Sequence, residues 1–131
     1  MGLWNKTLEV GIPTIDQQHK QLFDQVDILS DSSNSQRFAD TLKFLADYVV
    51  KHFSDEQLIH AKSQYPNAEL HKKMHTDFLA VFNQLKSEYD AGSHNLQVAL
   101  KVNKTIYDWL RSHIMVHDKE FAAYYKEQGA R

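Results

Sequence analysis

The segments HFSDE at residues 52–56 and HKKMH at residues 71–75 each carry two metal-binding side chains four residues apart. Residues four apart lie on one face of an α-helix, with their Cβ atoms about 5–6 Å apart. Each pair could therefore reach one metal ion, or two neighbouring ions. A single pair of this kind also arises by chance on the polar face of a helix, so the surrounding sequence has to decide between these interpretations.

The sequence around these segments predicts four long helices. Apolar residues recur at steps of three and four over about residues 13–30, 36–63, 68–91 and 95–117. The turn-forming sequences SDSSNS, YPN and AGSHN separate these segments, and such short connections favour antiparallel neighbours. Residues 1–12 are predicted to form an extended arm, and segment 118–131 a short last helix. The predicted fold is all-α, an up-down-up-down antiparallel four-helix bundle in a single domain over residues 1–131.

Composition limits the class of protein. The chain has 131 residues, of which 42% are hydrophobic and 24% charged, and only four Gly and two Pro, which favours long helices. The net charge of −2 predicts no general attraction to nucleic acid or to a membrane surface. No apolar run approaches the roughly 20 residues of a membrane span. The absence of cysteine excludes disulfides and thiolate chemistry and fits a cytoplasmic location.

Histidine and glutamate interrupt the apolar stripe of every predicted helix. These residues are His19 in the first helix, His52 and Glu56 in the second, His71 and His75 in the third, and His113 in the fourth. In an up-down-up-down bundle all of them fall within roughly 5–15 Å of the same end, at 1.5 Å of rise per residue. A buried glutamate needs a partner, and a metal ion is the best candidate. The pattern therefore favours a metal site over ordinary polar decoration.

The predicted stripes also place other residues. In the second helix Ile59 follows Glu56 on the inward face. In the fourth helix the inward positions are predicted to be Leu96, Leu100, Asn103, Ile106, Leu110 and His113. The remaining histidines, His60, His94 and His117, are interpreted as surface residues or as hydrogen-bonded core residues.

Asp118 has two interpretations. It follows His113 by five residues, which is about 500° of rotation on a regular helix, so the two side chains would not share a face. Both could still point inward if the helix ends or bulges between them. Alternatively, Asp118 caps the N-terminus of the segment that follows. The spacing alone leaves both interpretations open.

The chain resembles the hemerythrins, most closely the bacterial hemerythrins, from Trp4 to about Tyr125. The resemblance rests on the motifs DQQH, HFSDE, HKKMH and HIMVHD, in that order. It implies a non-haem centre of two iron ions bridged by an oxo or hydroxo group. By this resemblance His71, His75 and His113 bind one iron, His19 and His52 bind the other, and Glu56 and Asp118 bridge the two. The resemblance thus favours Asp118 as a ligand over Asp118 as a cap.

This ligand set implies a function. One iron has six ligands and the other five, so one position is open. The resemblance implies that dioxygen binds there reversibly as a hydroperoxide, for oxygen carriage, storage or delivery. Other small anions or nitric oxide are further expected ligands. Because five ligands are neutral imidazoles, O–O cleavage is disfavoured, and no enzymatic role is expected beyond minor peroxidase-like or nitric-oxide chemistry.

The resemblance also implies an apolar wall over the oxygen site. Its residues are Phe53, Trp109, Leu110, Ile114 and Trp4. Such a wall excludes water and slows irreversible oxidation. Ordinary core packing explains Trp4 and Leu110 nearly as well. Phe121 stands where many relatives carry tyrosine, so a hydroxyl near the ligands is missing here.

Two alternatives to oxygen carriage remain. The first is an oxygen-sensing or redox-sensing domain of a larger signalling protein, and the second is a di-iron enzyme that detoxifies peroxide or nitric oxide. The 131 residues contain no output domain, which favours the carrier. Reversible binding, as opposed to turnover, distinguishes the carrier from the enzyme.

Overall fold

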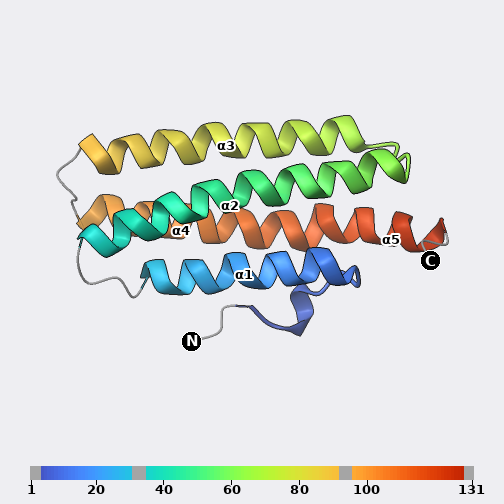
Figure 1. The fold of residues 1–131 in the computed structure, drawn as a ribbon, viewed down its shortest axis with the longest axis horizontal. Helices are drawn as coiled ribbons and strands as arrows, with labels where there is room; N and C mark the ends of the chain where they lie inside the picture. The colour runs from blue at the N-terminus through green and yellow to red at the C-terminus, as the bar shows by residue number, and fades with distance from the viewer. Residues whose placement is uncertain (1–3, 31–34, 92–95, 129–131) are drawn as a thin grey trace.

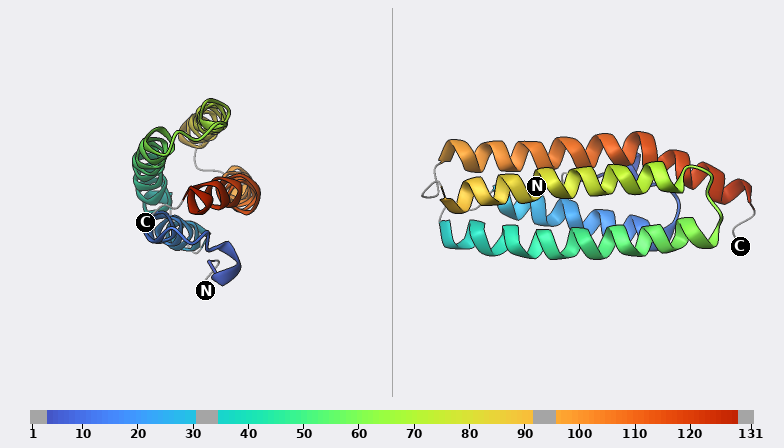
Figure 2. Two further views of the ribbon diagram at one scale, coloured as in Figure 1. Left: turned by 90° about the vertical axis from the view of Figure 1, so that its right-hand side faces the viewer. Right: turned by 90° about the horizontal axis from the view of Figure 1, so that it is seen from above.

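Four long helices run antiparallel, side by side, and form the body of the molecule (Figure 1). The computed structural model describes residues 4–30, 35–91 and 96–128. The helices are α1 (Pro13–Ser30), α2 (Ser35–Lys62), α3 (Ala68–Ala91) and α4 (Leu96–His113). Each helix packs against the next, and α4 packs against α1, which closes the bundle (Figure 2). The predicted up-down-up-down four-helix bundle is confirmed.

The fourth helix does not continue as a regular α-helix to residue 117. It ends at His113 and passes into η2 (Ile114–Asp118), a π-helical turn, which is followed by the short α5 (Lys119–Glu127). The chain continues past the end of the bundle through this turn, and α5 is tilted from the direction of α4 toward the other helices (Figure 2).

The N-terminal arm runs beside α1 and is tied to the start of that helix. Asp16, in the first turn of α1, accepts hydrogen bonds from the backbone N–H groups of Val10 (2.7 Å) and Gly11 (3.0 Å). Gly11 has a φ of 91°, a conformation that favours glycine. The arm is not wholly extended, because residues Lys6–Leu8 form the 3₁₀ turn η1, whose N-cap is the Asn5 side chain.

The apolar face of α4 differs from the predicted one. Leu96 is 73% exposed and Leu100 is 61% exposed, whereas Val102, Ile106 and Leu110 are buried. At about 100° per residue, Leu100 lies roughly 120° around the helix from Ile106, and therefore outside the buried face. The same kind of difference occurs in α2, where His60 is buried and Ile59 only half-buried.

The end of the bundle that holds most of the histidines is covered by α5. Tyr124 donates hydrogen bonds to the backbone oxygens of Ser63 (2.7 Å) and Gln64 (2.9 Å) in the α2–α3 turn. Tyr65, in the same turn, donates to Glu120 of α5 at 3.1 Å. These contacts fix the turn against the last helix and close this end of the core.

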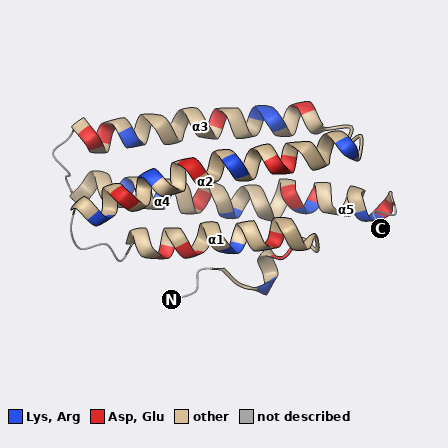
Figure 3. Ribbon diagram, in the orientation of Figure 1, with Lys and Arg blue, Asp and Glu red and all other residues tan. Residues whose placement is uncertain are grey.

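Charged residues of both signs are spread along all the long helices and form no block of one sign (Figure 3). This distribution agrees with the small net charge of −2. Among the described helices, none is both long and apolar enough to cross a membrane.

Candidate metal centre

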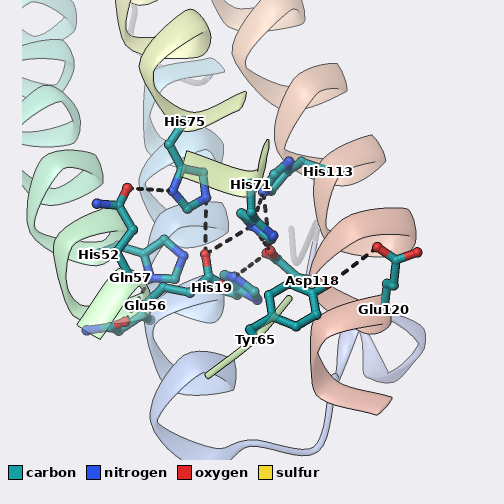
Figure 4. A network of polar contacts seen from close by, with 11 residues as sticks. His19, His52, Glu56, Gln57, Tyr65, His71, His75, His113, Asp118 and Glu120 are labelled. Atoms are coloured by element: carbon teal, nitrogen blue, oxygen red, sulfur yellow. Dashed lines mark hydrogen bonds and ion pairs between the residues drawn. The ribbon is translucent and has the colours of Figure 1, made fainter. Parts of the chain in front are cut away.

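Seven buried side chains meet inside the bundle, toward the end that α5 covers (Figure 4). They are His19 from α1, His52 and Glu56 from α2, His71 and His75 from α3, His113 from α4, and Asp118 from η2. Their metal-binding atoms form two groups, within each of which all atoms lie within 4.8 Å of one another. One group is Glu56, His71, His75, His113 and Asp118, and the other is His19, His52, Glu56 and Asp118. The two groups share both carboxylates.

The helical spacing explains why the histidines converge. His71 and His75 are one turn apart on α3, with ring centroids 4.6 Å apart. His71 also meets His113 across the bundle, at 4.6 Å between centroids. On the other side, His19 of α1 and His52 of α2 lie 4.7 Å apart. The in-phase positions predicted from the sequence therefore meet in space.

The π turn brings Asp118 into the cluster. A π turn has hydrogen bonds between residues five apart, so such residues share a face. The Asp118 carboxylate lies 3.0 Å from Nε2 of His71 and 3.1 Å from Nε2 of His19. Its side chain makes no capping hydrogen bond to α5. The capping interpretation is therefore wrong, and the bulge is the geometry that lets Asp118 point inward.

Several metal-binding atoms of the cluster have no hydrogen-bond partner within the described part of the chain. They are both ring nitrogens of His19, both carboxylate oxygens of Glu56, Nε2 of His75 and Oδ1 of Asp118. Glu56 Oε1 nevertheless lies only 3.1 Å from His75 Nε2, so the absence of a hydrogen bond between these two atoms is not due to distance. Buried polar atoms without a partner cost about 1–3 kcal/mol each. Nitrogens and oxygens that are close but not hydrogen-bonded fit ligands directed at shared cations.

Electrostatics inside the cluster separates the histidines. Burial is the main cause that lowers the pKa of His52 to about 4 and the pKa of His75 to about 2, and neighbouring histidines add to it. Burial also acts to lower the pKa of His71, but contacts with Asp118 and Glu56 outweigh it and raise that pKa to about 9. Neutral His52 and His75 present the lone pairs that a metal needs, while His71 must lose a proton first.

Burial acts to raise the pKa of Asp118, but the neighbouring histidines oppose it more strongly. The charge and contacts of His113, together with the contacts of His19 and His71, hold the pKa of this carboxyl well below its usual range. Asp118 is therefore an anion inside the core, and protonated His71, 3.0 Å away, is a cationic partner for it in the metal-free protein.

Two glutamines contact the outer nitrogens of cluster histidines, and the sequence reasoning missed both. Gln57 Oε1 lies 3.1 Å from Nδ1 of His75, and Gln18 Oε1 lies 2.7 Å from Nδ1 of His52. Because the amide oxygen accepts from Nδ1–H, each contact leaves Nε2 free to face the cluster. The only sequence clue is that each glutamine adjoins a cluster residue in the chain.

Aromatic rings cover one side of the cluster. Phe53 stacks on His75 with centroids 3.8 Å apart and an interplanar angle of 1°. Trp109 stacks on His113 at 4.3 Å and 11°, and meets Phe53 edge to face at 5.8 Å. Three of the five residues predicted to form the apolar wall, Phe53, Leu110 and Ile114, are buried, whereas Trp4 and Trp109 are half-buried against the core.

The other histidines differ from expectation in one case. His60 is buried, but neither of its ring nitrogens has a hydrogen-bond partner among the described residues, so it is not a hydrogen-bonded core histidine. Its ring packs on Phe121 at 4.2 Å and on His71 at 4.5 Å, and burial is the main cause that lowers its pKa to about 4. His117 is half-buried beside His113. His94 lies outside the described residues.

Comparisons with known proteins agree with this geometry. The family model of the hemerythrin HHE cation binding domain matches residues 10–125. Myohemerythrin-1 of Phascolopsis gouldii is 32% identical, over 91% of this chain and 90% of its own length. Bacteriohemerythrin of Methylococcus capsulatus is 34% identical, over 79% of this chain and 80% of its own length. A crystal structure of wild-type hemerythrin matches with a TM-score of 0.82 and 29% identity, over 92% of this chain and 94% of that chain. This chain therefore belongs to the hemerythrin family of oxygen-binding di-iron proteins.

Proposed function

We propose that the seven clustered residues hold two iron ions, that dioxygen binds reversibly at one of them, and that the protein carries, stores or delivers oxygen. The observation that supports this most directly is the pair of ligand groups that share Glu56 and Asp118. Two independent single-ion sites would not share both of their anionic ligands. A centre of two metal ions needs carboxylates that can reach both ions, and Glu56 and Asp118 are placed to do so.

The two ligand groups are unequal, and the proposal depends on this asymmetry. His71, His75 and His113 would hold one iron ion and His19 and His52 the second, while Glu56 and Asp118 would contribute to both. The second ion would then have one protein ligand fewer than the first. Iron in nitrogen and oxygen sites commonly takes six ligands, so one position remains for a small molecule on the second iron.

When bound, the iron pair supplies two electrons and the open coordination position that together hold dioxygen. The chain's own residues orient the ligands and exclude water. Phe53 and Trp109, stacked on His75 and His113, hold these imidazole rings in place and cover the cluster with apolar surface. We assign to this wall, with Leu110, Ile114 and Trp4, the role of keeping water from the open position.

Charge favours binding over oxygen cleavage. Five of the proposed ligands are imidazoles that bind iron in their neutral form, and only two are carboxylates. Such a ligand set stabilises high-valent iron less than a carboxylate-rich one, so we propose a binding protein and not an enzyme. Small anions such as azide are expected to compete for the same position. The cysteine-free sequence suits a reducing cytoplasm, where we place the protein.

The test is an oxygenation cycle. The purified protein is loaded with iron, reduced without air, exposed to oxygen and then returned to an oxygen-free atmosphere. We expect about two irons per chain and a visible charge-transfer band that develops with oxygen and is lost on its removal. The His113→Asn variant should bind less iron. The matched His117→Asn variant changes a neighbouring histidine that belongs to neither ligand group, and it should behave like the wild type.

Three results would change the conclusion. Two bound irons with immediate, irreversible oxidation would contradict oxygen carriage and favour a redox sensor. Catalytic consumption of peroxide or nitric oxide would favour the detoxifying enzyme. Failure to bind two metal ions would contradict the di-iron assignment itself.

A further inference from the structure

A chain of side-chain contacts connects the proposed ligand His52 with the surface of α2. Nδ1 of His52 lies 2.7 Å from Oε1 of Gln18. The amide nitrogen of Gln18 donates to Oδ2 of Asp55 at 2.8 Å. Nζ of Lys51 donates to the same Asp55 oxygen at 2.8 Å. Gln18 is buried, whereas Asp55 and Lys51 reach solvent, with side chains 36% and 63% exposed.

The chemistry of these groups allows only one direction of donation. An ionised carboxylate can only accept hydrogen bonds, so the NH₂ group of Gln18 has to face Asp55. The carbonyl oxygen of Gln18 then faces His52 and can only accept, which makes Nδ1–H of His52 the donor. The remaining nitrogen of His52, Nε2, keeps its lone pair for the metal. Asp55 thus determines the orientation of an amide, and through it the tautomer of a ligand that it does not touch.

Asp55 is well suited to this role because two hydrogen bonds hold its carboxylate in place. Nζ of Lys51 and the amide nitrogen of Gln18 both donate to Oδ2, each at 2.8 Å. The contacts come from two helices, since Gln18 belongs to α1 and the other three residues belong to α2. Packing of α1 on α2 therefore holds the chain of contacts in place.

The two ligand groups differ in this outer support. In the five-residue group, His75 contacts the amide oxygen of Gln57 at 3.1 Å, and no carboxylate contact with that amide is found within the described residues. In the four-residue group, His19 has no hydrogen-bond partner for either ring nitrogen in the same part of the chain. Among the described residues, His52 is therefore the one histidine of that group whose outer nitrogen has a hydrogen-bond partner, and the Asp55 carboxylate accepts from that partner.

We infer that Asp55, acting through Gln18, is a positioning residue for His52, and that it strengthens metal binding in the four-residue group by fixing the Nδ1–H tautomer and increasing electron donation from Nε2. This inference rests on the proposed function, because the four-residue group is the one assigned the open position. Groups that orient metal-bound histidines in this way typically contribute about 10–100-fold to metal affinity.

The first experiment measures metal affinity directly, with zinc(II) as a diamagnetic probe and a competing chelator. Wild-type protein is expected to bind two zinc ions per chain. Asp55→Asn removes the charge but keeps the size of the side chain. It should lower the zinc affinity of the lower-affinity site about tenfold or more. The matched control is Asp90→Asn, which removes the acid of another exposed Lys–Asp pair four residues apart, Lys86–Asp90 at the opposite end of α3 from His71. This control should leave both zinc sites unchanged.

A rescue variant separates positioning from mere helix stability. In the double variant Asp55→Asn with Gln18→Glu, the new carboxylate at position 18 can accept directly from His52, and the amide introduced at position 55 can donate to it. The zinc affinity should return to within about threefold of wild type. Nitrogen NMR of the metal-free protein adds a second readout. His52 should be a single Nδ1–H tautomer in the wild type and a mixture of tautomers in the Asp55→Asn variant.

Three results would overturn the inference. The first is an Asp55→Asn variant whose zinc affinities match those of Asp90→Asn. The second is a double variant that stays as weak as Asp55→Asn alone, which would leave only the lost Lys51–Asp55 ion pair as the cause. The third is a wild type that binds fewer than two zinc ions. Only this third result would overturn the proposed function as well.

Discussion

Nε2 of His113 and Oδ1 of Asp118 lie 3.2 Å apart although the two residues are separated by five positions in the chain. A regular α-helix would point them about 140° apart, since five residues give about 500° of rotation. The π turn at Ile114–Asp118 absorbs the extra residue and restores the shared face. One inserted residue in the last long helix thus supplies the second carboxylate of the cluster.

A second inserted residue in this segment should disconnect Asp118 from the cluster. An alanine added after the half-buried Met115 would place Asp118 six residues after His113, and the carboxylate would then rotate away from the site by roughly 100°. We expect the metal content to fall below two ions per chain, measured by elemental analysis, with helix content by circular dichroism close to wild type. Met115→Ala keeps the chain length and should retain two ions. Two bound ions in the insertion variant would show that the register of Asp118 relative to His113 is dispensable.

Glu56 is expected to lower the stability of the metal-free protein in return for metal binding. It is fully buried, and neither of its oxygens has a hydrogen-bond partner among the described residues. Replacing a buried ionic group with an apolar residue of similar volume is often neutral, or stabilising by about 1–4 kcal/mol. Metal-free Glu56→Leu should therefore unfold in urea at the same or a higher concentration than the metal-free wild type, yet bind no pair of metal ions. A clear loss of stability in the metal-free variant would contradict this account of Glu56.

Metal binding should release a proton from His71 near neutral pH. The raised pKa of about 9 keeps this histidine protonated in the metal-free protein, and the metal has to displace that proton. The apparent affinity for zinc should rise up to tenfold per pH unit between about pH 7 and about pH 9. Calorimetric titration in buffers of different ionisation enthalpy measures the proton released. A proton release near zero at about pH 7.5 would be inconsistent with this.

The stability of the metal-free protein should fall as the pH rises, whereas the zinc affinity should increase. The pKa of His71 is raised on folding, so its contribution to stability is complete below about pH 6.5 and is lost as the pH rises through about 9. The pKa values of His52 and His75 are lowered, so their contributions are already constant above about pH 6.5. Urea midpoints of the metal-free protein should accordingly fall between about pH 7 and about pH 9, and metal loading should reverse the trend.

Helical periodicity made the positions of the clustered histidines predictable. His71 and His75 stand one turn apart within an apolar stripe, and that spacing alone places both on the buried face. The four connected helices then bring the interrupted stripes to one end of the bundle. Local spacing and chain order were sufficient here, because both are properties of the backbone that the sequence pattern reports directly.

Features that depend on contacts between helices were not predictable in the same way. Gln18 and Gln57 are ordinary polar residues in the sequence, and only the packing of neighbouring helices turns their amides toward His52 and His75. The sequence IMVHD likewise carries no mark of a π turn. For Leu100 the sequence pattern was misleading in the other direction. Its apolar side chain and its spacing predicted a buried position, but it lies on the exposed side of α4.

Phe53 offers a test of the apolar wall that leaves every proposed ligand intact. Its ring stacks on His75 and meets Trp109, so a smaller, non-aromatic side chain such as leucine should open space beside the cluster without adding polarity. The smaller side chain loses buried surface and leaves a cavity, which should cost roughly 1–3 kcal/mol. A domain that is stable by about 5–15 kcal/mol tolerates this loss, so Phe53→Leu should still fold and bind two irons. The reduced, iron-loaded variant should oxidise irreversibly in air faster than wild type, because water reaches the iron more readily. The matched control is Phe82→Leu, the same swap at a buried core position in α3 one turn beyond Phe78. The oxidation rate is measured from the decay of the visible band. Equal rates for the two variants would show that Phe53 only fills the core.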